Sequence, residues 1–352
     1  MTPILFEALR VGNVPLCNRI AVSSMSTYNA NPNSHTVTTT HISHYSRLAA
    51  QHPGLVVLES TSVSKDAIFH EGDLGIWNEE QARGLKEVVD AIHKHNVPCC
   101  IQLNHPGRKS IGNCVVAPSE IHYMENFPKD KADAGKYKIP HALTRNEIDE
   151  IIDVYVLAAK RAASVCGADI IEIACCNGNL LHQFISKNCN LRDDEYGILK
   201  SDINNLDQTG GTSILLKIIK SIRQKISTPL FVKLAICDNI FKNEILDDTL
   251  QLCQALSKIV DLIDVTSGGI SPQSQPRYLL NNDKDIPGQV PLAQLVKQNT
   301  LGTKCFIGCS GGLNHNIKQL NQYVKSGQFD IAFIGKAFME QSNFMETILD
   351  KF

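Results

Sequence analysis

Two polar residues interrupt apolar runs of the sequence and are therefore candidates for chemistry. Lys233 lies within Leu230–Ala235, and Gln102 lies within Val97–Leu103. An unpaired buried charge is costly, so Lys233 must reach a partner or an open site. Its ammonium could hold a negatively charged ring system or, with a lowered pKa, form a Schiff base. Gln102 offers both a hydrogen-bond donor and an acceptor. For each residue the alternative is a satisfied polar group inside the core.

Glycine-rich turns follow two later apolar runs. Gly311 and Gly312 come directly after Cys305–Ser310, and Gly335 with Lys336 ends the last run. Glycine lets the backbone approach a ligand closely, and backbone amides can bind an anion, so the two turns together favour a phosphate site. Lys336 would add a positive charge. Simple turn formation is the alternative for each glycine pair.

The elements that must position these residues alternate along the chain. Eight apolar runs predict strands: Ile20–Met25, Gly54–Ser60, Val97–Leu103, Asp169–Cys175, Leu230–Ala235, Leu262–Ser267, Cys305–Ser310 and Ile331–Lys336. Between them, helical periodicity predicts Glu79–His95, Asn146–Cys166, Ile214–Ile226, Asp247–Ile259, Asn314–Ser326 and Phe338–Asp350. Near-continuous apolar strands that alternate with amphipathic helices indicate a parallel sheet covered by helices.

Eight such units favour an α/β fold of the closed (β/α)8 TIM-barrel type over an open doubly wound sheet. No G-x-G-x-x-G motif follows the first predicted strand, which removes the usual dinucleotide signature of the open sheet. We therefore expect one domain over residues 1–352. Two long connections, Asn104–Leu143 and Cys176–Gly211, would lie over the C-terminal rim, where barrels build their sites.

The composition excludes several classes of function. Among 352 residues, 34 are Lys or Arg and 36 are Asp or Glu, a formal net charge of −2 with no long basic block. Nothing in this balance calls for nucleic acid or an anionic membrane as a partner. The N-terminal residues do not have the pattern of a signal peptide, and no apolar stretch is long enough to span a bilayer. The 12 cysteines include no C-x-x-C pair, so we interpret them as small hydrophobes in a reducing, cytoplasmic compartment rather than metal ligands.

Short motifs follow one another in register from Leu5 to about Met339. They are Leu5-Phe6, Asn18 to Met25, Gly72–Trp77, Gln102–Lys109, Ala117–Ser119, Leu181–Phe184, Asn190–Gly197 and the two glycine-rich turns. Together they resemble the old yellow enzyme family of FMN-dependent ene-reductases, the NADH:flavin oxidoreductases. The resemblance is strongest to the bacterial-type branch, which carries a tyrosine at the position of Tyr28.

The resemblance implies FMN over the barrel mouth, NAD(P)H as reductant and a small-molecule electron acceptor. Lys233 stands where the family has an arginine near flavin N1, and a cation there stabilises the negative charge of reduced flavin. The resemblance is also compatible with a homo-oligomer. The implied cofactor residues are Ser23, Met25 and Ser60 beside the isoalloxazine, Gln102 at its pyrimidine edge, Lys233, and Gly311, Gly312, Gly335 and Lys336 at the phosphate.

The chain departs from the family pattern in the substrate motif. The family normally has His-x-x-His or His-x-x-Asn followed by Gly-Tyr, whereas this chain has Ala174, Asn177 and Asn179 at the matching positions. Of the two side chains that bind the substrate oxygen in the family, only Asn177 is retained. Asn179 replaces the proton-donating tyrosine, and an amide is not a usable general acid near neutral pH. We therefore predict Asn177 and Tyr28 as catalytic residues, with Tyr28, a cysteine or water as the substitute proton donor.

Three functions fit these residues. The first is an FMN oxidoreductase that takes hydride from NAD(P)H and passes it to an activated alkene, a quinone or a similar acceptor. The alternative is a flavin-binding barrel with weak or lost ene-reductase turnover. The third is a Schiff-base lyase that uses Lys233, which the motifs disfavour. The sequence does not distinguish NADH from NADPH, nor does it identify the natural acceptor.

Overall fold

A parallel β-barrel forms the centre of the molecule. The computed structural model describes residues 2–124, 137–198, 209–240, 247–275 and 288–352. Its barrel strands, each hydrogen-bonded to the next, are β3 (Ile20–Val22), β4 (Leu55–Val57), β7 (Cys99–Asn104), β10 (Ile170–Cys175), β11 (Leu230–Ala235), β12 (Leu262–Thr266), β13 (Phe306–Ser310) and β14 (Ile331–Ile334). Strand β14 pairs in parallel with β3 and closes the ring. The predicted (β/α)8 TIM-barrel fold is therefore confirmed, with strands shorter than several of the predicted runs.

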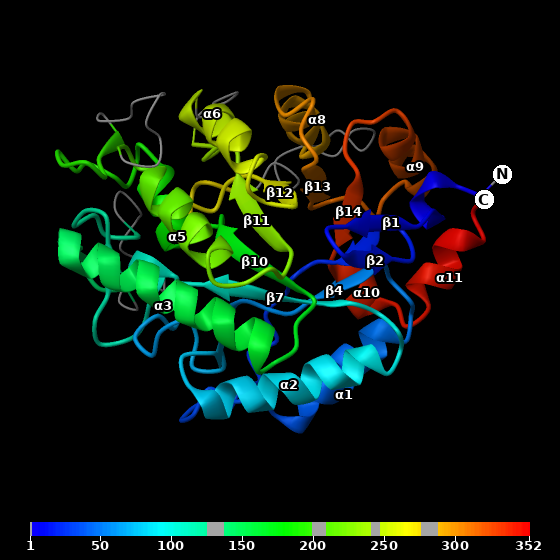
Figure 1. Ribbon diagram of the computed structural model, residues 1–352, viewed down its shortest axis with the longest axis horizontal. Helices are drawn as coiled ribbons and strands as arrows, with labels where there is room; N and C mark the ends of the chain where they lie inside the picture. Colours follow the sequence, from blue (N-terminus) through cyan, green and yellow to red (C-terminus); the bar gives the residue numbers. More distant parts are fainter. Residues whose placement is uncertain (1, 125–136, 199–208, 241–246, 276–287) are drawn as a thin grey trace.

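Helices surround this barrel (Figure 1). The longer ones are α1 (Thr39–Ala49), α2 (Glu79–His93), α3 (Arg145–Ser164), α5 (Ser213–Arg223), α6 (Asp247–Leu256), α8 (Val290–Asn299) and α9 (Ile317–Lys325). The shorter ones are α4 (Leu180–Ile185), α10 (Lys336–Glu340) and α11 (Phe344–Leu349). Side-chain caps define where several of them begin, as at α2 and α3. The Asn78 side chain accepts from the Gln81 amide before α2, and the Thr144 side chain accepts from the Glu147 amide before α3.

The sequence does not predict three of these helices, and it joins two others. The three are α1, α4 and α8. The sequence of α1, TTHISHYSRLA, is rich in residues of low helix propensity, and packing against α2 stabilises it. The single terminal helix predicted over Phe338–Asp350 is wrong, because Gln341 adopts an extended conformation that ends α10 before α11 begins.

The N-terminal half of the barrel interior is apolar. Its floor is a hairpin of β1 (Leu9–Val11) and β2 (Val14–Leu16), whose Val11, Val14 and Leu16 side chains join one buried cluster with inward-facing strand residues. Gly12 turns this hairpin with φ +59°, and a Cβ there would lie only 2.9 Å from Pro229 Cγ, just before β11. Polar side chains occupy the opposite, C-terminal half, so chemistry is confined to one end of the barrel.

Several short elements lie at the two ends of the barrel. At the N-terminal end is η1 (Ile4–Phe6), where the Leu5 carbonyl accepts from the Arg19 amide just before β3. In the connections at the C-terminal rim are β5 (Thr61–Ser62), β6 (Leu74–Gly75), η2 (Gly107–Lys109), β8 (Val116–Ala117) and β9 (His141–Ala142). Neighbouring cysteines point to opposite sides of their strand: Cys99 packs among the helix-facing residues and Cys100 in the barrel interior. None of the helices in the described ranges combines the length and apolar character needed to cross a lipid bilayer.

Candidate active site

The predicted phosphate-binding residues follow two neighbouring strands, β13 and β14. Gly311 and Gly312 come after β13 with φ values of +109° and +69°. Gly335 follows β14 and precedes Lys336, whose side chain is exposed. Since β13 pairs with β14, the two turns lie side by side at the same end of the barrel. The two glycine turns and the exposed Lys336 thus lie on one stretch of rim.

Ser23 and Met25 follow the next strand, β3, and complete this side of the rim. The Ser23 amide donates to the carbonyl of Ile334, which ties it to the end of β14 at 3.0 Å. Met25 lies against Gly335 so closely that a Cβ on that glycine would be 2.2 Å from the Met25 Sδ. Only glycine permits this approach without moving the methionine. Ser60, partly buried, lies beyond the end of β4 on the same rim.

Lys233 points into the polar half of the barrel, where three side chains accept from its ammonium. The Nζ atom lies 2.7 Å from Asp264 Oδ2, 2.9 Å from Ser310 Oγ and 3.2 Å from Ser23 Oγ. Burial alone would lower the pKa of Lys233, but the carboxylates of Asp264 and Glu172 hold it above its usual range. The amine is therefore protonated at neutral pH and cannot act as the nucleophile that a Schiff-base lyase needs.

Gln102 is buried on β7, two strands from Lys233 in the barrel ring. Its Nε2 atom donates to Glu172 Oε1 at 2.7 Å, and its Oε1 atom accepts from Ser24 Oγ at 2.8 Å. Burial raises the pKa of the Glu172 carboxyl, and the nearby Lys233 ammonium only partly offsets this. The barrel interior thus holds one ammonium and two carboxylates, Glu172 and Asp264, of which Glu172 resists ionisation.

Glu172, Asp264, Ser310 and Ser24 were not identified from the sequence. A usable signal existed for the two carboxylates, because each interrupts an apolar strand in the same manner as Lys233. The hydroxyl residues gave no such signal. Serine is common at strand ends, and only the register of β11, β12 and β13 brings Ser310 to the lysine.

The altered substrate motif lies at the end of β10. Ala174 faces the barrel interior and clusters with Cys176 and Ala235. Asn177 is exposed in a left-handed conformation, φ +55°, and Asn179 precedes α4 without a side-chain cap. A Cβ on the intervening Gly178 would lie 2.2 Å from the carbonyl of Gly269, so the loop is pinned against the connection after β12.

One charged residue that the sequence analysis did not single out reaches this loop. Lys109, from η2, donates from Nζ to the backbone carbonyl of Asn177 at 2.8 Å. Its ammonium also lies 5.0 Å from the ring centroid of Phe69 and 5.5 Å from that of Tyr123. Burial lowers the pKa of Lys109 to about 8. An ammonium whose pKa is lowered by burial therefore lies beside the altered motif.

Tyr28 lies apart from this loop and is 43% exposed. Its ring centroid is 4.5 Å from that of His70, and its backbone is left-handed with φ +55°. Burial of part of the ring and the carboxylate of Asp73 raise its pKa. Directly before it, Thr27 donates from its amide and its hydroxyl to the buried Glu59 carboxylate, both at 2.8 Å. These bonds fix the segment that presents Tyr28 at the rim.

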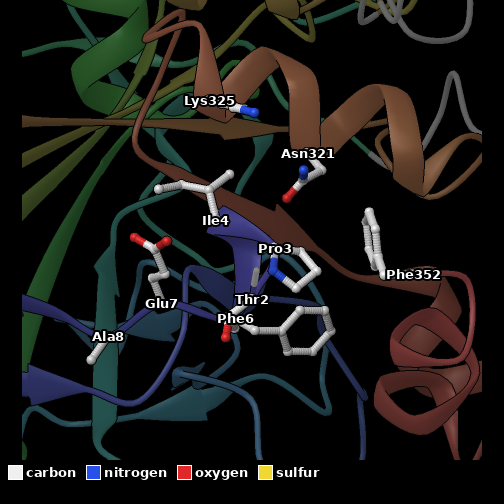
Figure 2. A pocket seen from close by; sticks show the side chains of 9 residues that line it. All are labelled: Thr2, Pro3, Ile4, Phe6, Glu7, Ala8, Asn321, Lys325 and Phe352. Atoms are coloured by element: carbon white, nitrogen blue, oxygen red, sulfur yellow. The ribbon is translucent and has the colours of Figure 1, made fainter.

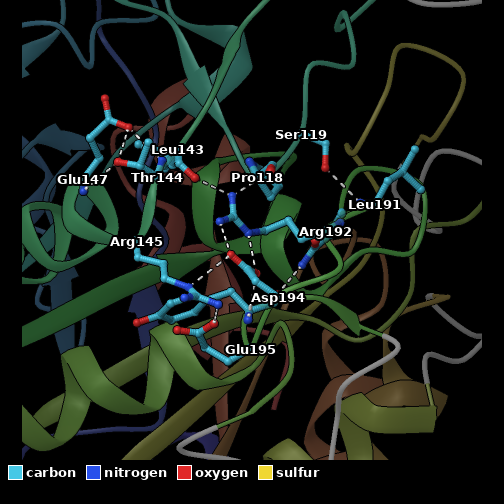
Figure 3. Close-up of polar contacts among 12 residues, drawn as sticks. Pro118, Ser119, Leu143, Thr144, Arg145, Glu147, Leu191, Arg192, Asp194 and Glu195 are labelled. Carbon is cyan, nitrogen blue, oxygen red and sulfur yellow. Dashed lines mark hydrogen bonds and ion pairs between the residues drawn. The ribbon is translucent and has the colours of Figure 1, made fainter.

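The long rim connections are anchored by Arg192 (Figure 3). Its guanidinium donates to the carbonyls of Pro118 and Leu143 and forms a salt bridge with Asp194. The Leu191 amide donates to Ser119 Oγ at 2.9 Å. Arg192 therefore joins the connection after β7, the start of α3 and the connection after β10 into one assembly above the barrel.

These residues fit the groups that FMN presents. The phosphate is matched by the glycine turns and Lys336, and the imide edge of the flavin ring by donors and acceptors at Gln102 and Lys233. Two buried oxygens at inward positions of β7 and β10, Asn104 Oδ1 and Glu172 Oε2, have no hydrogen-bond partner. Buried polar atoms normally have partners, so these acceptors are consistent with a polar ligand at this end of the barrel.

No group of three or more His, Cys, Asp or Glu side chains within the described residues is arranged to hold a metal ion.

A surface pocket also exists where the two chain termini meet (Figure 2). Its lining comes from the N-terminal segment, α9 and the last residue: Thr2, Pro3, Ile4, Phe6, Glu7, Ala8, Asn321, Lys325 and Phe352. None of the predicted site residues contributes to it.

Comparison with known proteins gives a consistent result. A family model described as NADH:flavin oxidoreductase / NADH oxidase matches residues 4–351. An NADPH dehydrogenase from Halalkalibacterium halodurans is 32% identical over 338 residues, which cover 95% of this chain and 90% of the relative. The old yellow enzyme homologue from Zymomonas mobilis superposes with a TM-score of 0.79 at 21% identity, covering 99% of this chain and 93% of that one. A 2-naphthoyl-CoA reductase in complex with 2-naphthoyl-CoA superposes with a TM-score of 0.85 at 20% identity, and the match covers 100% of this chain but 53% of that one.

Proposed function

The chain belongs to the NADH:flavin oxidoreductase / NADH oxidase family and is an NAD(P)H-dependent FMN oxidoreductase, and we propose that the C-terminal rim of its barrel forms both the flavin site and the acceptor site. One observation carries this assignment. Glycine turns and an exposed lysine follow the C-terminal ends of β13 and β14, and buried polar side chains such as Gln102 and Lys233 lie inside the same barrel.

Each part of the rim has a proposed role toward the cofactor. When bound, FMN supplies the hydride transfer between the reductant and the acceptor. Lys233 and Gln102 hold the pyrimidine edge. The residues proposed beside the ring are Ser23, Met25 and Ser60, and those proposed at the phosphate are Gly311, Gly312, Gly335 and Lys336.

Asn177 and Tyr28 are the proposed acceptor-binding residues. The Asn177 amide can donate to the oxygen of a carbonyl acceptor, whereas Ala174 offers no second donor. A site with one hydrogen-bond donor to the carbonyl oxygen in place of two polarises an enone weakly. Quinones need less polarisation, so we propose that activated alkenes and quinones are both acceptors, with quinones the faster.

The alternative is a flavin-binding barrel with weak or lost ene-reductase turnover. The substitutions Ala174 and Asn179 favour it, since each removes a side chain that could take part in alkene reduction. Both functions include FMN binding and reduction by NAD(P)H. They differ only in what happens to the electrons afterwards.

We further propose that residues 1–352 work as one FMN-binding domain in the cytoplasm. Ten of the 12 cysteines are buried, as small hydrophobic residues in a reducing compartment would be. A small-molecule acceptor, without nucleic acid or membrane, is the expected partner. A homo-oligomer is compatible with this function.

The test begins with the purified protein. Flavin released by heat should be FMN by mass, at one equivalent per chain, and anaerobic NADPH should bleach the bound flavin. A folded protein that neither carries FMN nor binds it on incubation would overturn the proposed site.

A further inference from the structure

Reduction of an activated alkene requires a proton as well as a hydride, and the altered motif leaves its source unassigned. The hydride forms a bond to the β-carbon and supplies both electrons. The α-carbon must then receive a proton. Neither Ala174 nor Asn179 can supply it near neutral pH.

Three ionisable groups besides Lys109 are candidates for this proton, and each is poorly suited. His182 is completely buried, its Nδ1 accepts from the Gly178 amide at 3.0 Å, and its Nε2 pairs with Asp238. Cys176 is 1% exposed, and burial raises its thiol pKa to about 12. Its proton is therefore both inaccessible and tightly held. Tyr28 packs on His70 instead of the Asn177 loop, and its pKa is raised above the usual tyrosine range.

Lys109 is bound directly to the loop that carries Asn177. Its Nζ lies 2.8 Å from the Asn177 carbonyl, and the rings of Phe69 and Tyr123 flank it at 5.0 and 5.5 Å. These contacts use only part of the donor capacity of an ammonium, which has three N–H bonds. The side chain is partly buried, so one N–H can face the acceptor while water remains close enough to restore the proton.

We propose that Lys109 is the general acid that protonates the α-carbon of an alkene acceptor in this protein, in place of the missing tyrosine. This inference rests on the proposed function of the rim. As the hydride bonds to the β-carbon, the π pair of the alkene moves to the α-carbon and takes a proton from the ammonium. The amine left behind is neutral and is reprotonated by water, so charge and atoms balance.

The charges that face Lys109 decide the pH range in which it can act. Burial and the neighbouring Arg108 lower its pKa, the Cys176 thiol and the Asp73 carboxylate raise it, and the net pKa is about 8. The ammonium is the acid, so it is present below this pH and is lost as the pH rises through it. Alkene reduction should therefore slow above about pH 8, whereas quinone reduction should not.

Stopped-flow reoxidation tests this directly. The FMN-loaded protein is reduced anaerobically with dithionite and mixed with 2-cyclohexen-1-one or benzoquinone between pH 6.5 and 9.5. Lys109→Met should slow reoxidation of the flavin by cyclohexenone about 10²-fold or more, and the decrease in rate near pH 8 should disappear. Lys109→Arg should be as slow, because a guanidinium keeps the charge but does not release its proton. Lys138→Met removes another lysine of the same connection, one that donates to the Gly112 carbonyl at 3.0 Å, and should change neither rate.

A measurement independent of turnover follows the same group. After reductive methylation with ¹³C-formaldehyde, one dimethyl-lysine resonance should titrate near pH 8 in the FMN-loaded protein and be missing from Lys109→Met. Unperturbed lysines titrate near 10.4.

Several results would overturn the inference while leaving the proposed function intact. One is a Lys109→Arg protein that cyclohexenone reoxidises at the parent rate. A second is a decrease in this rate near pH 8 that persists in Lys109→Met. A third is a slower rate in Tyr28→Phe with no change in the Lys109 variants. Absence of the titrating resonance would do the same. Failure to bind FMN would instead refute the proposed site itself.

Discussion

The ammonium of Lys233 lies 2.7 Å from the carboxylate of Asp264 inside the barrel, and both side chains are almost completely buried. The charge that is proposed to face the flavin is therefore already shared with a carboxylate. A buried pair of this kind gives a field that depends on both partners. Removing the lysine and removing the aspartate should therefore shift the reduction potential of bound FMN in opposite directions.

Lys233→Met should lower the two-electron reduction potential of bound FMN, because it leaves the Asp264 and Glu172 carboxylates uncompensated beside the reduced flavin. We expect a shift of about 30 mV or more, a factor of about ten in the equilibrium. Asp264→Asn should raise the potential instead. Dye-equilibrated titration measures both. An unchanged potential in a Lys233→Met protein that still binds FMN would show that another group supplies the charge.

Glu172 makes stability depend on pH. Its pKa is raised by burial, so between about 4.3, the pKa expected in the unfolded chain, and the raised value the folded state binds more protons than the unfolded state. Its contribution is complete below that range and is lost as the pH rises through the folded pKa. Glu172→Gln, which stays neutral, should therefore gain stability relative to the parent at pH 8 but not near pH 4.5.

Urea unfolding at fixed free FMN measures this difference. Burial also raises the pKa of Glu59 to about 7. Since Glu59 is present in both proteins, part of the dependence of unfolding free energy on pH should remain in Glu172→Gln. Equal pH dependence in parent and variant would mean that Glu172 is ionised throughout.

Gly178 pins the loop of Asn177. It has φ +71°, and a Cβ there would lie 2.2 Å from the Gly269 carbonyl. Gly167 has nearly the same conformation, φ +74°, but nothing lies within 4 Å of its Cβ position. Gly167→Ala should cost about 1 kcal/mol from the backbone alone, and Gly178→Ala clearly more. Denaturant unfolding compares them, and equal losses would mean that the loop can move aside.

Arg192 and Arg145 provide a second matched pair (Figure 3). The Arg192 side chain is 10% exposed and donates to two backbone carbonyls, whereas Arg145 is 64% exposed and pairs with Glu195. Arg192→Met should destabilise the protein by about 1–3 kcal/mol, because buried carbonyls lose their donor. Arg145→Met should cost about 0–1 kcal/mol. Similar thermal shifts for the two variants would contradict this account of the rim.

Site residues could be predicted from the sequence where a polar residue interrupts an apolar strand. Lys233 and Gln102 stood out because they interrupt apolar strands, and both lie in the barrel interior. Glu172 and Asp264 interrupt strands in the same way, yet their pairing depends on the register of β7 with β10 and of β11 with β12. Lys109 ends one of the motifs that carry the family resemblance, but its contact with Asn177 could not be predicted, since it depends on the path of the connection after β7. Helix α1 was missed because packing, and not its own propensity, stabilises it.

The central claim is that this protein reduces its flavin readily but passes electrons to enones through an incomplete site. The most direct test is a double-mixing stopped-flow experiment: NADPH reduces the FMN-loaded protein anaerobically, and benzoquinone or 2-cyclohexen-1-one then reoxidises it. A lost oxyanion donor typically costs about 10²–10³ in rate. We predict rapid bleaching by NADPH, rapid reoxidation by the quinone, and reoxidation by cyclohexenone slower by about that factor. Cyclohexenone that reoxidises the flavin as fast as the quinone would contradict the claim, because the site would then be complete without the residues that Ala174 and Asn179 replace.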